Sequence, residues 1–180
     1  QTIESVTHSR WGHAAIVVVR DDGEPLLLQS DGWSVPDVED QTLKFGVQLS
    51  PMRAYLEKEG YLPSRERQHA VVRRLEGFEV DRDRLEAVIR QAHDKPYDLD
   101  PFDWFKAEAR QLGVDVPVEQ RTDTFWCSAL VGFVLTRLGA LDPSTSWSML
   151  APSDFDPASD QLRWAGGASL GPAEVVRQVA

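Results

Sequence analysis

The chain has 180 residues, enough for one domain whose hydrophobic core needs no disulfide or metal to stabilise it. Apolar residues make up 42% of the chain and charged residues 27%, an ordinary globular composition that argues against intrinsic disorder. The net charge of −10 disfavours binding to nucleic acids and to anionic membranes, because phosphate groups are repelled. No apolar run reaches the roughly 18 residues that an integral membrane span requires. We therefore expect a single domain over residues 1–180.

The first half of the chain predicts mainly β-strands. Residues 14–19 form a β-branched run that closes at the turn signal Asp21-Asp22-Gly23, and residues 26–29 follow as the hairpin partner. Residues 44–49 and 70–75 are two further strand candidates. Between them, Ser50 and Pro51 are typical of a helix start, with the serine as N-cap, and Gly60 marks the end of that helix.

The second half predicts helices over residues 82–93 and 100–112, each with apolar residues on one face. The most apolar helix follows, with Asp123 or Thr124 as its cap, a run over residues 125–135, and Gly139 as its end. It is apolar nearly all round and should be the central buried helix. A short amphipathic segment, residues 172–179, ends the chain. Strands first and helices later favour an α+β fold, with a small antiparallel sheet packed on the central helix.

Cys127 is the first candidate for chemistry, as the one cysteine of the chain, which excludes an internal disulfide. It lies near the predicted start of the central helix, where free backbone N–H groups and the helix dipole stabilise a thiolate. Such a thiolate can attack a carbonyl carbon. The alternative is a small core residue, since free cysteines are often buried.

His13 is the candidate base, at the mouth of the first strand after Trp11-Gly12. The alternative is a strand-end histidine with an ordinary hydrogen bond. His8, His69 and His93 compete for the role, and His93 suits a helix C-terminus, where a cation is favourable.

Gln29 is the candidate residue to orient the ring of the base, because the hairpin can place both side chains on one face of the sheet. Asp31 is the acidic alternative, and an ordinary polar strand residue is the other explanation for Gln29. Neither paired carboxylates nor metal-ligand spacing is present in the sequence, and Gly166-Gly167 lacks the lysine of a phosphate loop. No cofactor is expected.

Six short segments in order resemble the circularly permuted NlpC-type papain-like hydrolases, specifically the YiiX-like branch. Together they cover roughly residues 11–156. They resemble the family's histidine strand, the strand with the orienting residue, the arginine strand, the Pro-Tyr-Asp segment, the aromatic-Cys-Ser helix and the Pro-Ser-Asp turn. These are residues 11–18, 26–30, 71–75, 95–98, 125–131 and 151–155.

The resemblance implies a permuted papain-like fold with Cys127 as nucleophile, His13 as general base and Gln29 as the orienting residue. It also implies that the Tyr97 hydroxyl helps to stabilise an oxyanion; the alternative for Tyr97 is a packed aromatic. Two positions depart from the family pattern: a neutral amide stands at Gln29, where relatives have an acidic residue or histidine, and Ala129 stands where a glutamate is usual. If that glutamate aids substrate binding in relatives, the second departure implies that the function differs here.

We therefore expect a cysteine peptidase or amidase-like hydrolase whose substrate contains an amide, peptide or other acyl group. One alternative is a lipid acyl hydrolase or acyltransferase with an apolar groove beside Cys127, for which the tryptophans at 11, 33, 104 and 126 are candidates. A second is a non-catalytic binding domain on an inherited fold.

The first residue is Gln1, without a basic-then-apolar leader, which predicts either removal of a leader or a piece of a longer polypeptide. A lone unpaired thiol fits a reducing compartment such as the cytoplasm somewhat better than an oxidising one, and the sequence leaves localisation and oligomeric state open.

Overall fold

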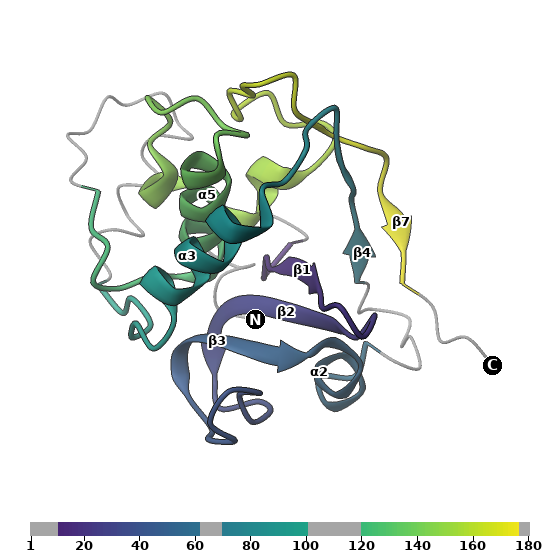
Figure 1. Ribbon diagram of the computed structural model, residues 1–180, viewed down its shortest axis with the longest axis vertical. Coiled ribbons are helices and arrows are strands. Elements are labelled where there is room, and N and C mark those ends of the chain that lie inside the picture. Colours follow the sequence, from purple (N-terminus) through teal and green to yellow (C-terminus); the bar gives the residue numbers. More distant parts are fainter. Residues whose placement is uncertain (1–10, 62–69, 101–119, 177–180) are drawn as a thin grey trace.

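The computed structural model describes residues 11–61, 70–100 and 120–176 and has the α+β architecture expected from the sequence (Figure 1). Its main sheet is antiparallel, in the order β1-β2-β3. The three strands are β1 (Ile16–Val19), β2 (Pro25–Gly32) and β3 (Phe45–Pro51). Gly23, in the β1–β2 turn, has φ +84°, a conformation that strongly favours glycine.

The two faces of this sheet pack on different helices. Leu26 and Leu28 of β2 face the main core, which includes α5 (Cys127–Leu138). Leu27 packs on the other side with Tyr55 of α2 (Met52–Lys58). Because side chains alternate along a strand, the positions of Gln29 and Asp31 lie on the α2 side with Leu27.

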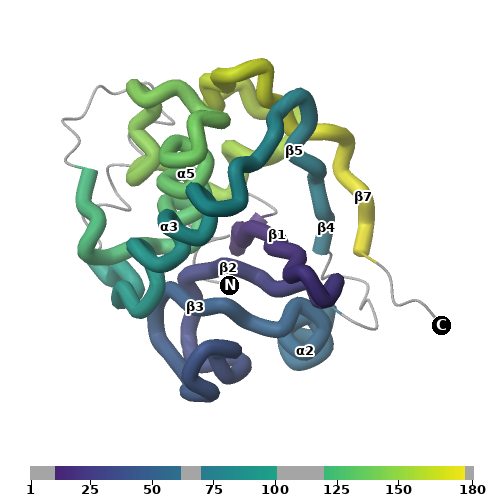
Figure 2. The backbone as a smooth tube through the Cα atoms, viewed as in Figure 1, coloured from purple at the N-terminus to yellow at the C-terminus, as the bar shows by residue number. Residues whose placement is uncertain are grey.

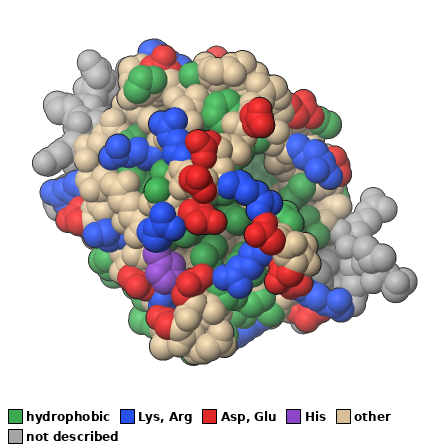
Figure 3. All heavy atoms as spheres, in the orientation of Figure 1, with side chains coloured by type: hydrophobic (Ala, Val, Ile, Leu, Met, Phe, Trp, Pro, Cys, Tyr) green, Lys and Arg blue, Asp and Glu red, His purple; other side chains and the backbone are tan. Residues whose placement is uncertain are grey.

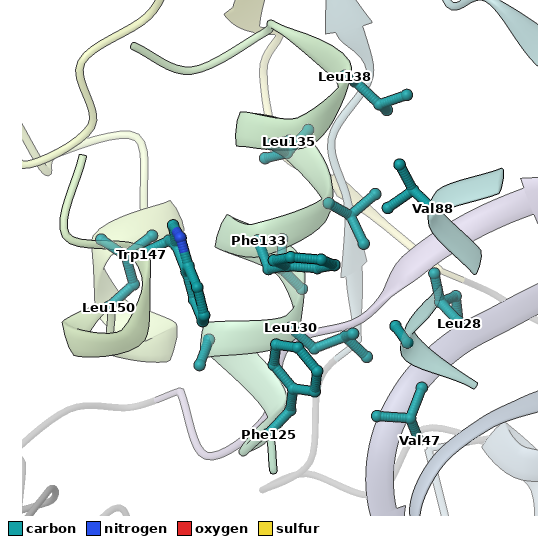
Figure 4. Close-up of a cluster of buried hydrophobic side chains, with 14 of the residues drawn as sticks. Leu28, Val47, Val88, Phe125, Leu130, Phe133, Leu135, Leu138, Trp147 and Leu150 are labelled. Atoms are coloured by element: carbon teal, nitrogen blue, oxygen red, sulfur yellow. The ribbon is translucent and has the colours of Figure 1, made fainter. Parts of the chain in front are cut away.

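Helix α5 is the central helix, as its composition predicts, and ten of its twelve residues are buried. It packs against the sheet, against α3 (Arg82–Ala92) and against the short 3-10 helix η1 (Trp147–Met149). Figure 4 shows Phe125, Leu130 and Phe133 between Trp147 and Leu150 on one side and Leu28, Val47 and Val88 on the other. Gly132 allows close approach to η1, since a Cβ there would lie 2.9 Å from that of Trp147.

The C-terminal part of the described chain returns to the first half (Figure 2). After η2 (Pro152–Phe155), two short strands pair with two segments that precede α3. β7 (Glu174–Val175) pairs with β4 (Val71–Val72), and β6 (Ser169–Leu170) pairs with β5 (Leu75–Glu76).

Residues 94–98, here called the strap, join the free edge of β3 to the segment that enters α5. Val47 N donates to Lys95 O at 2.8 Å, and Tyr97 N donates to Phe45 O at 3.2 Å. On its other side, Phe125 N donates to Pro96 O at 3.1 Å. The strap therefore fixes the position of the start of α5 relative to the sheet.

Two predicted helix caps are wrong. Ser50 lies within β3, paired with Leu27, and its hydroxyl accepts a hydrogen bond from Gln29 instead of capping α2. Thr124 donates to Asp98, and neither it nor Asp123 caps α5. The strap keeps Phe125 extended, so the helix begins only at Cys127 and has Trp126 as its N-cap.

The predicted strand over residues 70–75 is divided into β4 and β5, because the two halves pair with different partners. Arg73, between them, donates to the carbonyls of Gly171, Phe155 and Leu170 at 2.7–2.8 Å. The amphipathic tail, as far as it is described, forms β7. The helix predicted over residues 100–112 lies almost wholly outside the described residues, as does the end of the tail.

Candidate active site

Cys127 is the first residue of α5, at the positive end of the helix dipole. No side chain caps this end, and the backbone N–H groups of Ala14 and Ser128 donate to the sulfur. The neighbouring side chains are held elsewhere, because Trp126 Nε1 and Ser128 Oγ both donate to Leu150 O, at 3.2 and 2.6 Å. The residue is only 2% exposed, and its buried sulfur has three polar partners: the His13 ring and the backbone N–H groups of Ala14 and Ser128.

His13 precedes β1 and is hydrogen-bonded to Cys127, so folding brings together two side chains that are far apart in sequence. Its Nε2 lies 2.9 Å from Gln29 Oε1. An amide oxygen only accepts, so Nε2–H is the donor. Each ring nitrogen has one hydrogen-bonding position, which leaves Nδ1 to face the sulfur. His13 as a whole residue is partly exposed, whereas Cys127 and Gln29 on either side of its ring are buried.

Gln29 is fully buried on β2 and holds the ring from behind. Its Nε2 donates to Ser50 Oγ at 3.1 Å, which turns the amide so that its oxygen points to His13. The result is a chain of hydrogen bonds that runs from Ser50 through Gln29 and His13 to Cys127. The sequence predicted Ser50 as a helix cap, and this role was missed. The feature that could have indicated it is a polar residue within a strand whose residues Val47 and Leu49 are apolar.

The charges of the sulfur and the ring stabilise each other. Burial alone would lower the pKa of His13, but the hydrogen bond and charge of Cys127, followed by the charge of Asp31 and the amide of Gln29, raise it to about 9. Burial alone would raise the pKa of Cys127, but His13 and the backbone N–H groups of Ala14 and Ser128 lower it below its usual range. Both shifts favour a thiolate–imidazolium pair at neutral pH.

Tyr97 lies on the strap beside this pair and packs on Phe45 with the two rings tilted and their centroids 5.1 Å apart. Burial, followed by the negative charges of Cys127, Asp31 and Asp98, raises the pKa of Tyr97. Its hydroxyl therefore stays protonated at neutral pH and remains a hydrogen-bond donor.

Asp31 does not contact the ring nitrogens of His13, and its carboxylate accepts a hydrogen bond from Tyr55 Oη at 2.8 Å. The ring of Tyr55 lies 6.0 Å from that of His13. Burial, followed by the charge and hydrogen bond of Asp31, raises the pKa of Tyr55. Nothing in the sequence distinguished Tyr55 from an ordinary core aromatic.

His93 belongs to a separate cluster at the C-terminus of α3. Its Nε2 lies 2.9 Å from the buried Asp37 carboxylate, which also accepts from the backbone N–H of Leu49 and of Glu39. Lys44 forms ion pairs with Asp37, Asp40 and Asp94. His8 and His69 lie outside the described residues. Among the histidines that the structure describes, His13 is the one in contact with Cys127.

Within the described ranges, no group of three or more histidine, cysteine or acidic side chains is arranged to hold a metal ion. In the same part of the chain, no helix has the length and apolarity needed to cross a bilayer. Comparisons with protein-family models, curated proteins and solved structures found no match to this chain. The geometry of the site is therefore what indicates a function.

Proposed function

We propose that the chain is a cysteine hydrolase of permuted papain-like fold that cleaves an amide, peptide or related acyl bond. The contact that supports this most directly is the Cys127–His13 hydrogen bond, with Gln29 Oε1 behind the ring at 2.9 Å. A nucleophile, a base and a group that orients the base form the arrangement by which thiol hydrolases operate.

In the first half of the reaction, the Cys127 thiolate attacks the carbonyl carbon and the π electrons move to the oxygen. The backbone N–H of Cys127, which has no acceptor within the helix, is available to this oxyanion, and the protonated Tyr97 hydroxyl is a second donor. The His13 imidazolium then gives its proton to the leaving nitrogen, the C–N bond breaks, and a thioester with Cys127 remains.

In the second half, neutral His13 takes a proton from water while the oxygen of that water adds to the thioester carbonyl. The C–S bond breaks and releases a carboxylic acid. The sulfur leaves as the thiolate beside the imidazolium, so the resting pair is restored and one water is consumed. None of these steps needs a metal or an organic cofactor.

The lipid acyl hydrolase alternative requires an apolar groove beside the sulfur. Trp126 is buried in the core with its indole N–H bonded to Leu150 O, and Trp11 Nε1 donates to Asp156. Trp33, stacked on Phe45, is 62% exposed, and Trp104 lies outside the described residues. An amide substrate is therefore our first choice. Parallel assays with short peptides and acyl thioesters distinguish the two.

Alkylation by iodoacetamide tests the proposal, because the chain has a single thiol. We expect Cys127 to react well below pH 8, where an ordinary thiol with a pKa near 8.5 is almost fully protonated. In His13→Ala the thiolate loses its counter-charge, so the rate at about pH 6.5 should fall by roughly tenfold or more.

Hydrolysis should decline above about pH 9, where His13 loses the proton that the leaving group needs. The exposed charge substitution Glu24→Gln is the control for both measurements. A thiol that is inert below pH 8 in the folded protein would refute the hydrolase and favour a binding domain.

A further inference from the structure

Asp31 lies two residues beyond Gln29 on β2, and alternation along the strand places both side chains on the α2 side of the sheet. Asp31 is paired with Gly46 on β3, and a glycine has no side chain that could cover the carboxylate on that face of the sheet. The sheet therefore holds a carboxylate one step beyond the amide that contacts the base.

Tyr55 determines where this carboxylate points. Its hydroxyl donates to Asp31 Oδ2 at 2.8 Å, and its ring, 5% exposed on α2, packs 6.0 Å from the ring of His13. Asp31 and His13 are thus both neighbours of one buried aromatic ring. The carboxylate is kept on the side of the sheet where the imidazole lies.

Within the described ranges, the groups that face His13 come from three elements: Gln29 and Asp31 from β2, Tyr55 from α2, and Cys127 from α5. Gln29 is neutral, and Tyr55 stays protonated because burial and Asp31 raise its pKa. Of these groups, only Cys127 and Asp31 can carry a negative charge. During the reaction the sulfur becomes a neutral thioester, which leaves Asp31 as the negatively charged member of this set of described groups.

We infer that two tasks often performed by one carboxylate are divided here: Gln29 orients the imidazole, and Asp31, anchored by Tyr55, stabilises its positive charge. Asp31 is a positioning residue in this scheme, because it acts on His13 and does not touch the substrate. The inference depends on the proposed function for its role in turnover. The electrostatic effect itself can be measured in the resting protein.

The test is an NMR titration of His13 in histidine-labelled protein. The chain has four histidines, and the signal of His13 is the one that disappears in His13→Ala. Asp31→Asn keeps an oxygen for Tyr55 and removes only the charge. We expect the pKa of His13 to fall by about one pH unit, roughly a tenfold loss of proton affinity. The alkaline limit of hydrolysis should move to lower pH by the same amount.

Two variants complete the experiment. Glu24→Gln removes an equal charge at an exposed site just before β2 and should leave the titration of His13 unchanged. Tyr55→Phe keeps the carboxylate but releases it, so a smaller fall in the pKa of His13 is expected. An unchanged titration in Asp31→Asn, or an equal change in Glu24→Gln, would overturn the inference.

The outcome is separable from that of the proposed function. If the protein hydrolyses no amide but Asp31→Asn still lowers the pKa of His13, the hydrolase fails and the charge effect holds. If hydrolysis is found and the titration does not move, the reverse is true.

Discussion

The reactivity proposed for Cys127 depends on neighbours that hold the imidazole in place. His13 is partly exposed and precedes its strand, so its backbone alone does not restrict the ring. The restriction comes from Gln29, whose amide is itself held by Ser50 at 3.1 Å. A neutral amide provides direction with little charge, and in the inferred scheme Asp31 supplies that charge.

Replacing Gln29 with leucine should therefore reduce kcat/KM far more than it reduces stability. Leucine fills a similar volume but leaves Nε2–H without an acceptor, so the ring loses its orientation, and we expect a fall on the order of a hundredfold or more. Ser50→Ala should give a smaller loss, because the amide stays but can rotate. Kinetics on a peptide substrate and a urea unfolding curve for each variant provide the check. Equal losses of activity in the two variants would contradict this order.

At the scale of elements, the strap explains both a success and a failure of prediction. Apolar periodicity correctly indicated β1–β3, α3 and α5, because these elements bury whole faces. The start of α5 was placed too early, since the strap holds Phe125 in an extended conformation and no local pattern encodes this contact. The strand over residues 70–75 was divided for a similar reason, through pairing with the distant residues 169–175. For Cys127, His13 and Gln29, residue type and hairpin alternation suggested the cluster but left ordinary structural roles open, and the family resemblance was what assigned the three residues to one site.

The strap predicts that a substitution outside the site can disturb it. Gly46 has φ +148°, and a Cβ there would lie 2.2 Å from Lys95 O. Gly46→Ala should push the strap outward, displace Tyr97, destabilise the fold by about 2 kcal/mol and slow alkylation of Cys127 at neutral pH. Gly23→Ala, at φ +84° with no atom within 4 Å of the added Cβ, should cost about 1 kcal/mol without changing the alkylation rate. Similar alkylation rates in wild-type protein and Gly46→Ala would show that the strap does not control the site.

At the scale of the whole molecule, the net charge affects which ligands can approach, and long-range contacts affect stability. On the face shown in Figure 3, basic and acidic side chains alternate and form no single-sign patch. The net charge of −10 therefore acts as a diffuse repulsion of anions and not as a directed binding surface on that face. The contacts between distant parts of the chain depend on Arg73, whose hydrogen bonds join the segment before α3 to two C-terminal segments.

Arg73→Lys should destabilise the protein by about 2 kcal/mol, because a lysine cannot reproduce three directed hydrogen bonds to the carbonyls of residues 155, 170 and 171. The adjacent Arg74, whose side chain is exposed, offers a matched control in Arg74→Lys. Urea unfolding of the two variants measures the difference. The same midpoint for both would show that the Arg73 contacts contribute little.

The order of the site residues along the chain has a consequence for biosynthesis. His13, Gln29 and Asp31 all leave the ribosome more than ninety residues before Cys127. The hairpin can arrange the imidazole and its supports early, but the sulfur joins them only when α5 docks. Under the proposed function, the thiol of a nascent chain would therefore gain its reactivity only at this late step, when α5 docks against the hairpin.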